Sequence, residues 1–396
     1  MSRQTKKGLF TIFLICTMIV LSACERLEWE ETGLLPPEPM QISTRPIAIE
    51  SRFILKEDNS LWTWGWENRR LFGESSENFQ VPSVAMENVI AISSCSTAAN
   101  TAVIKSDGTL WRWGEHWPTG CRRHRFGPIH LMDDVVGVEV DGSRTYAITS
   151  DGTLWQFRLQ SCDDYDSREG RYRYVYPPVQ LLEDVSSVVS RGHTVAILHD
   201  NTIWAWGQNR YGELGANVRG RDQETPVQIM EDVVSVSVTW GRTMAITSDG
   251  TLWAWGLNDR GQLGIGTTRN QAQAVQVMDD VVTVVAASRQ TFAITSDATL
   301  WAWGDNRYGQ LGDGTMQDRH SPVKIMENVV YVHSTVSSTR AITSDGNVWA
   351  WGDNTDGTLG LGSERGAWEW QRDRPYIILF SSWPNPVQIM VYQPME

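Results

Sequence analysis

Cysteine and histidine, the side chains that could form a disulfide or hold a metal ion, gather in two long connections of the chain. One connection carries His116, Cys121 and His124, and the other carries Cys162. If the chain is exported, the first expectation is a disulfide between Cys121 and Cys162, with Cys95 outside the pair or acting as an alternative partner. A metal site made from the same cysteines and histidines lacks any short Cys-X-X-Cys or His-X-X-X-His spacing. We therefore expect no metal ion and no cofactor.

Acidic pairs recur along the chain and raise the question of a calcium site. The pairs are Glu87-Asn88, Asp133-Asp134, Glu183-Asp184, Glu231-Asp232, Asp279-Asp280 and Glu327-Asn328. Calcium takes about six to eight oxygen ligands, which is more than one tight turn can offer. We expect solvated turns instead, because Asp and Asn are favoured turn residues.

The sequence contains no catalytic motif. Neither a Gly-X-Ser-X-Gly nucleophile motif nor a phosphate-binding loop is present, and the glycine-rich stretches lie between expected strands rather than before a helix. We therefore expect that the protein is not an enzyme. Nucleic acid is also an unexpected partner, because the formal net charge is -13 and the arginines are scattered among carboxylates, whereas polyphosphates need a clustered basic surface.

These residues are embedded in a repeat whose marker is Trp-X-Trp-Gly, as in Thr251-Leu252-Trp253-Ala254-Trp255-Gly256. Seven copies, including the degenerate Trp155-Gln156-Phe157, have their first tryptophans at positions 62, 111, 155, 204, 253, 301 and 349. The interval of 44 to 49 residues is in the range of solenoids and propellers. One uniform repeat over most of the 396 residues favours a single closed array over several domains.

Each repeat has the pattern of four short β-strands. In one unit, apolar and polar residues alternate over 227–230, 233–238, 243–247 and 252–255, which is typical of half-buried strands. The two tryptophans of the marker share one face of the sheet, where they can pack against the next unit. An Asp-Gly pair between the last two strands predicts a two-residue type I′ turn. One unit has Asp297-Ala298 there instead, and Ala is the poorest of these residues at positive φ.

Seven such units without helical periodicity predict an all-β fold, a seven-bladed β-propeller of four-stranded antiparallel blades. Three motifs together resemble the repeat of the regulator of chromosome condensation family. They are the Trp-X-Trp-Gly strand, the segment His193-Thr194-Val195-Ala196-Ile197, and the loop Asn258-Asp259-Arg260-Gly261-Gln262-Leu263-Gly264-Ile265-Gly266. The resemblance covers residues 46–396 and implies a propeller that acts by presenting loops to partner proteins, as members of the family mostly do.

The ends of the repeat predict how the ring closes. The segment Pro386-Val387-Gln388-Ile389-Met390 matches the strand that begins a unit, at 227–230, but the other three strands of a unit do not follow it. Residues 47–64 supply those three strands, but no strand of the 227–230 type precedes them. We expect the C-terminal strand to complete the N-terminal blade, which would remove an open sheet edge. The long connections after Trp-X-Trp-Gly then cross between blades, although a different grouping of the strands is left open.

Loops at the two ends of antiparallel strands form two faces, because successive strands alternate in direction. Of the 20 tryptophans, 13 mark the repeat, and five others fall in loops of one face together with arginines. The candidate binding residues are Trp66, Trp117, Trp240, Trp368 and Trp370 with Arg69, Arg122, Arg123 and Arg242. Trp and Arg are enriched at protein-binding hot spots, so we expect this face to bind a partner. The alternative is that these loops only pack over one another.

Residues 1–23 have the pattern of a secretory signal, in which Arg3, Lys6 and Lys7 precede an apolar run over 9–21. This run is too short to span a membrane comfortably. The segment Leu21-Ser22-Ala23-Cys24 resembles the lipobox of bacterial lipoproteins, which implies that Cys24 is lipidated, for example with palmitate. Residues 24–45 are acidic and rich in Pro, typical of an extended linker, and 46–396 form the propeller. We expect a lipid anchor in the cell membrane or outer membrane of a bacterial envelope.

The sequence thus predicts an exported, membrane-anchored, monomeric protein that binds an envelope or extracellular protein through one propeller face. Nucleotide exchange on a small GTPase, the eukaryotic activity of the family, is not expected, because an exported domain does not meet a cytosolic GTPase. Two alternatives stay open. An envelope enzyme acting on polysaccharide would place suitably spaced carboxylates on that face, and a purely structural surface protein would bury the loop tryptophans.

Overall fold

The computed structural model describes residues 46–50, 53–63, 83–95, 100–116, 124–158, 165–166, 171–172, 177–216, 220–355, 359 and 382–390. These residues form thirty β-strands, and they include no helix long and apolar enough to cross a membrane. Seven four-stranded antiparallel sheets follow one another along the chain, each paired in the order of its strands. The predicted all-β fold of seven four-stranded units is therefore confirmed. We name the strands of each sheet, or blade, A to D in chain order.

The first three blades are built as follows. Blade 1 consists of β1 (Pro46–Glu50), β2 (Phe53–Lys56), β3 (Leu61–Thr63) and β4 (Ser83–Met86). Blade 2 consists of β5 (Val89–Cys95), β6 (Asn100–Lys105), β7 (Leu110–His116) and β8 (His124–Met132). Blade 3 consists of β9 (Val135–Asp141), β10 (Arg144–Thr149), β11 (Leu154–Arg158) and β14 (Val179–Leu182). A small hairpin of β12 (Tyr165–Asp166) and β13 (Arg171–Tyr172) precedes β14.

The other four blades are more regular. Blade 4 consists of β15 (Val185–Arg191), β16 (His193–Leu198), β17 (Ile203–Gly207) and β18 (Gln223–Met230). Blade 5 consists of β19 (Val233–Thr239), β20 (Arg242–Thr247), β21 (Leu252–Gly256) and β22 (Gln271–Met278). Blade 6 consists of β23 (Val281–Ala286), β24 (Gln290–Thr295), β25 (Leu300–Gly304) and β26 (Arg319–Met326). Blade 7 consists of β27 (Val329–Ser334), β28 (Ser338–Thr343), β29 (Val348–Asp353) and β30 (Ser382–Met390).

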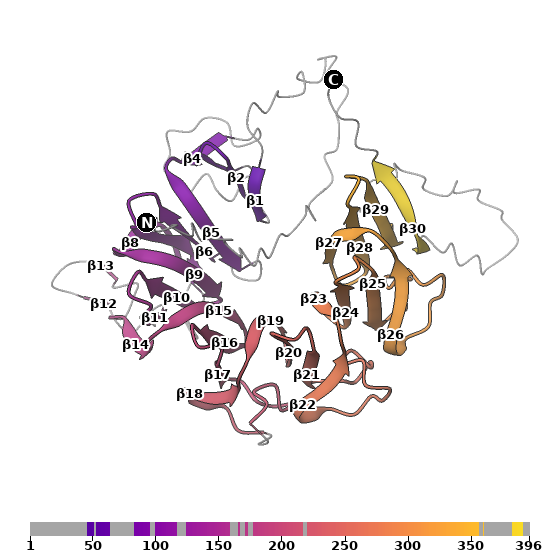
Figure 1. Cartoon of the computed structure of the whole chain (residues 1–396). Helices are drawn as coiled ribbons and strands as arrows, with labels where there is room; N and C mark the ends of the chain where they lie inside the picture. The colour runs from indigo at the N-terminus through magenta and orange to yellow at the C-terminus, as the bar shows by residue number, and fades with distance from the viewer. Residues whose placement is uncertain are drawn as a thin grey trace, which may run out of the picture.

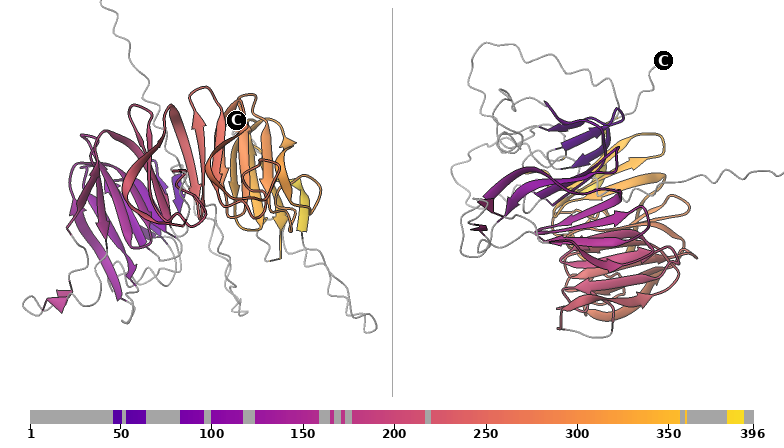
Figure 2. Two further views of the ribbon diagram at one scale, coloured as in Figure 1. Left: turned by 90° about the horizontal axis from the view of Figure 1, so that it is seen from below. Right: turned by 90° about the vertical axis from the view of Figure 1, so that its left-hand side faces the viewer.

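The blades are arranged side by side around a common centre, as in a propeller (Figure 1). Strand A of each blade lies on the inside of the arc and strand D on the outside. Views at right angles show the sheets packed face to face around the disc, with their strands crossing its thickness (Figure 2). Loops therefore emerge only at the two flat faces of the disc.

The structure corrects the predicted grouping of strands. Strand D pairs with strand C of the same blade across the long connection, as Trp253 with Gln276 shows in blade 5. The C-terminal strand β30 accordingly belongs to blade 7, where Trp349 pairs with Gln388, while blade 1 has its own fourth strand. The prediction that the C-terminal strand completes the N-terminal blade is wrong. The long connection is a hairpin within a blade, and the short acidic pair crosses to the next blade.

The second tryptophan of each regular repeat is the centre of the packing between blades. Trp113, Trp255, Trp303 and Trp351 are all 0% exposed. Trp255 packs against apolar residues of the preceding blade, such as Val195. Burying one such ring contributes on the order of 4 to 6 kcal/mol as an upper bound. The predicted structural role of these tryptophans is confirmed.

The turn between strands B and C is a three-residue loop rather than the predicted two-residue type I′ turn. In blade 5 the Gly250 amide donates to the Thr247 carbonyl at 2.9 Å, and the Thr247 amide donates to the Thr251 carbonyl at 3.0 Å. Gly250 has φ of +83°, whereas Asp249 is not at positive φ. The loop is thus a type I turn followed by one left-handed residue. In blade 6 that residue is Ala298, with φ of +63°.

We predict that Ala298→Gly stabilises the protein. A left-handed conformation costs a residue with a Cβ about 1 to 2 kcal/mol, and the extra freedom of Gly in the unfolded chain offsets part of this. The free energy of unfolding in urea should therefore rise by about 1 kcal/mol. Gly250→Ala, at the equivalent position of blade 5, should lower it. An unchanged or lowered value for Ala298→Gly would contradict this view of the turn.

Candidate functional site

The loops separate onto two faces as predicted. The A–B loops and the long C–D connections form one face, which we call the loop face. The B–C turns and D–A crossings form the other, the turn face, where they contact each other: the Ser248 amide donates to the Asp232 carbonyl at 2.9 Å, and the Val281 amide donates to the Gly250 carbonyl at 2.8 Å.

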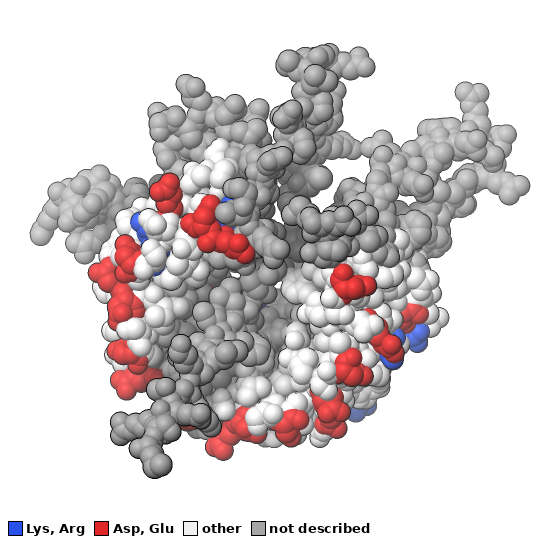
Figure 3. Space-filling model, turned by 45° about the horizontal axis from the view of Figure 1, so that its top comes forward, with Lys and Arg blue, Asp and Glu red and all other residues white. Residues whose placement is uncertain are grey.

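The acidic pairs lie on the turn face and are turns, as predicted. All six pairs are exposed, and the second residue of each has a left-handed φ between +59° and +63°. Asp and Asn tolerate this conformation better than other residues with a Cβ. Acidic side chains recur along the rim of the described surface in Figure 3, with fewer basic ones between them.

On the loop face, one backbone carbonyl joins each pair of regular blades. In blade 5 the Gln262 carbonyl accepts the indole N–H of Trp303 at 3.0 Å and the hydroxyl of Thr291 at 2.7 Å, both from blade 6. Glu213 forms the same pair of bonds to blade 5, with Trp255 at 2.8 Å and Thr243 at 2.8 Å. Gln310 does so with blade 7. We call this two-donor contact the carbonyl clasp.

The glycine-rich loop is shaped to deliver that carbonyl. The side-chain oxygen of Asn258 accepts the Leu263 amide at 2.8 Å, and its amide nitrogen donates to the Thr267 carbonyl at 2.8 Å. Gly264 has φ of +80°, and a Cβ on it would stand 2.7 Å from the indole nitrogen of Trp303. The predicted need of these glycines for positive φ or close approach is therefore confirmed.

The first residue of strand B makes a second contact between blades. In blade 5 this residue is Arg242, which was predicted to bind a partner. Arg242 is fully buried. It donates to the carbonyls of Ala287, Ser288 and Gln290, in the next blade, at 2.6, 3.0 and 2.7 Å. Burial lowers the pKa of its guanidinium to about 9. The structure corrects the prediction that Arg242 meets a partner, because the neighbouring blade surrounds the side chain.

The junction between blades 3 and 4 departs from this arrangement. The A–B loop of blade 4 is the single residue Gly192, and the side chain of Arg144, the counterpart of Arg242, has no hydrogen bond within the described residues. The indole N–H of Trp206, the counterpart of Trp303, also has no acceptor there. Thr194 donates instead to the hydroxyl of Tyr146 on blade 3 at 2.9 Å. The carbonyl clasp is thus replaced by a tyrosine.

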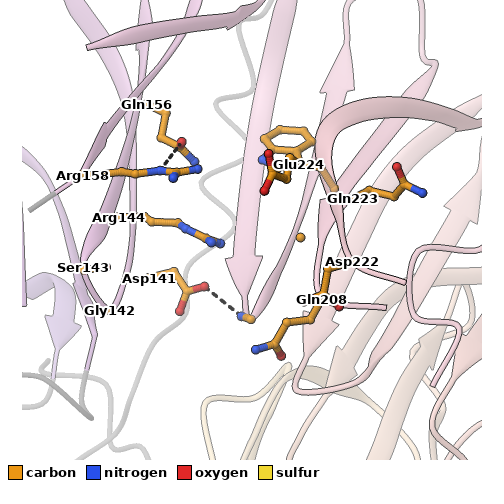
Figure 4. A pocket seen from close by; sticks show the side chains of 13 residues that line it. Asp141, Gly142, Ser143, Arg144, Gln156, Arg158, Gln208, Asp222, Gln223 and Glu224 are labelled. Carbon is orange, nitrogen blue, oxygen red and sulfur yellow. Dashed lines mark hydrogen bonds between the residues drawn. The ribbon is translucent and has the colours of Figure 1, made fainter. Parts of the chain in front are cut away.

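A cavity of about 460 Å³ opens on the loop face at this junction. Arg144 and Arg158 extend into it from blade 3, whereas Gln208 and Glu224 line it from blade 4 (Figure 4). Arg158 donates through Nε to the side-chain oxygen of Gln156 at 3.0 Å. The volume lies in the range of ligand-binding pockets.

Three carboxylates at this junction hold the backbone in place. Asp141 accepts the Gly192 amide at 2.8 Å. Asp222 accepts the Asn209 amide at 3.1 Å. Glu139, which is buried on β9, pairs with Arg191 at 2.8 Å, and burial raises the pKa of its carboxyl. This arrangement favours a structural use of these carboxylates over the acid and base pair that glycoside hydrolysis requires.

An exposed tryptophan borders the cavity. Trp240, in the A–B loop of blade 5, is 57% exposed, and its ring meets that of Tyr211 edge-on with centroids 6.2 Å apart. It lies against the cavity residue Gly192, where an added Cβ would stand 3.2 Å from the indole. Trp240 therefore lies in a loop of the predicted face and is accessible there, a point that the sequence had left open.

Most of the other predicted site residues lie outside the described residues. These are Cys24, Trp66, Arg69, Trp117, Cys121, Arg122, Arg123, Cys162, Trp368 and Trp370. Cys95 is buried among the apolar residues between blades 2 and 3. His116 and His124, two of the four residues of the alternative metal site, are directly opposite each other in the β7–β8 ladder.

Sequence reasoning missed Arg144 and Arg158. A usable signal was present, because Arg158 follows Trp155-Gln156-Phe157 where all six other repeats end in glycine, at Gly65, Gly114, Gly207, Gly256, Gly304 and Gly352. A charged residue in place of a repeat glycine marks a local change of structure. The sequence pattern alone identifies this copy of the marker only as degenerate.

Comparison with known proteins identifies relatives of the repeat region. The family model of the RCC1-like domain matches residues 123–392. The X-linked retinitis pigmentosa GTPase regulator homolog of Caenorhabditis elegans is 24% identical over 202 residues, covering 49% of this chain and 14% of the relative. The Ultraviolet-B receptor UVR8 of Arabidopsis thaliana is 33% identical over 186 residues, covering 43% and 42%. The matches thus span less than half the length of either relative.

Solved structures share the fold. Prp20p from Saccharomyces cerevisiae superposes with a TM-score of 0.58 at 16% identity, covering 84% of this chain and 86% of that chain. Human WBSCR16 gives a TM-score of 0.57 at 16% identity, covering 78% and 84%. At this level of identity the likeness concerns the propeller architecture.

We predict that His193 makes stability depend on pH. The side chain is fully buried, and its Nε2 lies 2.7 Å from the Thr243 hydroxyl. Burial lowers its pKa from 6.5 to about 4, so unfolding takes up a proton between these pH values. The free energy of unfolding therefore falls as pH drops through that window, by up to about 3 kcal/mol.

His193→Gln, which copies Gln290 at the equivalent position of blade 6, should reduce this slope in urea denaturation series at pH 7, 6, 5 and 4. His199→Gln changes an exposed histidine and is the matched control. The prediction would be wrong if the free energy of unfolding changed with pH equally in His193→Gln and in the unchanged protein.

Proposed function

The chain belongs to the RCC1-like domain family, and on this basis we propose that it is a non-catalytic protein-binding module that uses the loop face of its propeller. Yeast RCC1 (Prp20) was crystallised with Kap60 bound, and Prp20p was described with its binding properties to Gsp1p and histones. Those partners are partners of the yeast protein. The partner proposed for this chain is an envelope or extracellular protein.

The observation that carries this proposal is an exposed tryptophan beside an arginine-lined cavity. Trp240 is 57% exposed, and Arg144 and Arg158 line the adjoining cavity. A large aromatic ring next to arginines is the composition of binding hot spots. Trp66, Trp117, Trp368, Trp370, Arg69, Arg122 and Arg123 remain further candidates on the same face, on the strength of their positions in the sequence.

The proposed site of action is the outer side of a bacterial membrane. Its support is the basic and apolar pattern of residues 1–23, followed by Leu21-Ser22-Ala23-Cys24. The acidic, Pro-rich stretch over 24–45 would then hold the propeller away from the bilayer. Nucleotide exchange on a cytosolic GTPase is not part of the proposal, because the exported domain would not encounter that substrate.

The binding proposal predicts that Trp240→Ala loses a partner. Full-length protein in mild detergent is immobilised and incubated with envelope extract of the source organism, and the retained proteins are identified by mass spectrometry. Truncating a hot-spot tryptophan costs about 2 kcal/mol or more, so retention of the partner should fall by at least about tenfold. Val282→Ser, which alters an exposed residue of β23, is the control. Equal retention of the partner by Trp240→Ala and by the unchanged protein would show that Trp240 does not take part in binding.

The anchoring proposal predicts that Cys24→Ala releases the protein from the membrane. Cells expressing the unchanged protein should incorporate labelled palmitate into it, and the protein should enter the detergent phase on phase separation. Cys24→Ala should do neither, whereas Cys16→Ala, within the cleaved segment, should behave like the unchanged protein. Labelled, detergent-phase Cys24→Ala protein would exclude this lipid anchor.

A further inference from the structure

Two arginines face each other in blade 3 where other blades have no charge pair. Arg144 and Arg158 are direct partners in the β10–β11 ladder. In blades 4 to 7 the matching pairs are His193 with Gly207, Arg242 with Gly256, Gln290 with Gly304, and Ser338 with Gly352. Directly opposite residues of an antiparallel pair project from the same face of the sheet, where two like charges destabilise it. Something other than strand pairing must favour this arrangement.

The protein itself supplies little compensation within its described residues. Arg242 places its guanidinium among three backbone carbonyls, but blade 4 offers only Gly192 at the matching loop. The guanidinium of Arg144 accordingly forms no hydrogen bond or ion pair with the described part of the chain. Arg158 has one bond, from Nε to the Gln156 amide oxygen. Most of the ten guanidinium N–H donors of this pair therefore have no acceptor among the described residues around the cavity.

The remaining wall of the cavity defines what can fill it. Gln208 and Gln223 contribute amide groups, and Glu224 adds a carboxylate on the side of blade 4 (Figure 4). Guanidinium forks match the two oxygens of a carboxylate or a phosphate. A phosphate dianion would double both its attraction to the two arginines and its repulsion from Glu224, Asp141 and Asp222, which also line the cavity. Because these three carboxylates outnumber the two arginines, one added negative charge is opposed less than two. The lining therefore favours a single negative charge held between the two arginines.

We infer that the cavity between blades 3 and 4 binds the carboxylate of an acidic side chain on a peptide, with Arg144 and Arg158 as its two ligands. The exposed ring of Trp240 stands beside the opening and would cover the adjoining peptide segment. The identification of a partner protein as the source of the carboxylate rests on the proposed function. Binding of a carboxylate in the cavity does not.

The test is isothermal titration calorimetry of the full-length protein in detergent with the blocked peptide acetyl-Gly-Glu-Gly-amide. We expect saturable binding of this peptide and none of acetyl-Gly-Gln-Gly-amide, which has the same shape without the charge. Arg144→Gln and Arg158→Gln should each weaken binding by about tenfold or more, as expected for loss of a charge-assisted hydrogen bond. Arg289→Gln, an exposed arginine of the loop face outside the cavity, should have no effect.

Folding is controlled within the same series. Gln290 occupies the position of Arg144 in blade 6, so Arg144→Gln introduces a side chain that the repeat already accepts. Both cavity variants should show the melting temperature of the unchanged protein or a higher one, because a like-charge pair is removed. Absence of binding by the acidic peptide, or equal binding by the cavity variants, overturns the inference. Tighter binding of inorganic phosphate than of the acidic peptide overturns the choice of a carboxylate.

The outcome is separable from that of the binding proposal. A partner captured through Trp240, with no affinity for the acidic peptide, would refute the carboxylate pocket and leave the binding module intact. Carboxylate binding that needs both arginines, with no partner lost in Trp240→Ala, would support the pocket and refute the role of Trp240.

Discussion

The regular part of the structure, blades 4 to 7, depends on backbone carbonyls that each accept two hydrogen bonds from the next blade, at Glu213, Gln262 and Gln310. In blade 5 this is the carbonyl of Gln262, which binds the indole of Trp303 and the hydroxyl of Thr291. A buried tryptophan needs an acceptor for its N–H, because an unsatisfied donor in the interior costs about 1 to 3 kcal/mol. Satisfying that donor fixes the angle at which one blade meets the next, and the rest of the loop is shaped to present the carbonyl. The glycine-rich motif therefore joins blades 4 to 7 to one another.

The same constraint explains where a site can form. At the junction of blades 3 and 4, Tyr146 takes the place of the carbonyl for Thr194, and a cavity opens on the loop face. The two arginines and the exposed Trp240 meet there. The candidate site thus lies at a junction that departs from the regular contacts of blades 4 to 7, which is common where functional sites interrupt a regular scaffold.

The sequence predicted the repeated parts of the fold because each is dictated by local physics. Alternation around Val233 predicts strands, the pair Trp253 and Trp255 predicts packing on one sheet face, and Gly264 predicts a close approach. The grouping of strands into blades could not be predicted in this way. A long C–D connection can be a hairpin or a crossing, and hydrogen-bond partners far apart in the chain decide which. Burial of Arg242 was equally hidden, because the carbonyls that surround it belong to the next repeat.

The candidate site was predictable only in part. Trp240 departs from the repeat and stood out as an extra tryptophan in a loop, but Arg144 has the same residue type as the buried Arg242 at the same position. Only the length of the neighbouring loop, one glycine in blade 4, separates an arginine that joins two blades from one that faces a cavity. The loop that decides the environment of the arginine belongs to the next repeat, so the sequence around the arginine does not reveal it.

The carbonyl clasp is tested most directly by comparing Trp303→Phe with Trp206→Phe in urea denaturation. Both changes replace the indole by the ring that blade 3 already has at Phe157, but only Trp303 donates its N–H to a carbonyl. The account predicts that Trp303→Phe lowers the free energy of unfolding by about 1 kcal/mol more than Trp206→Phe does. Equal losses, or a larger loss at Trp206, would show that the indole bond does not join the blades.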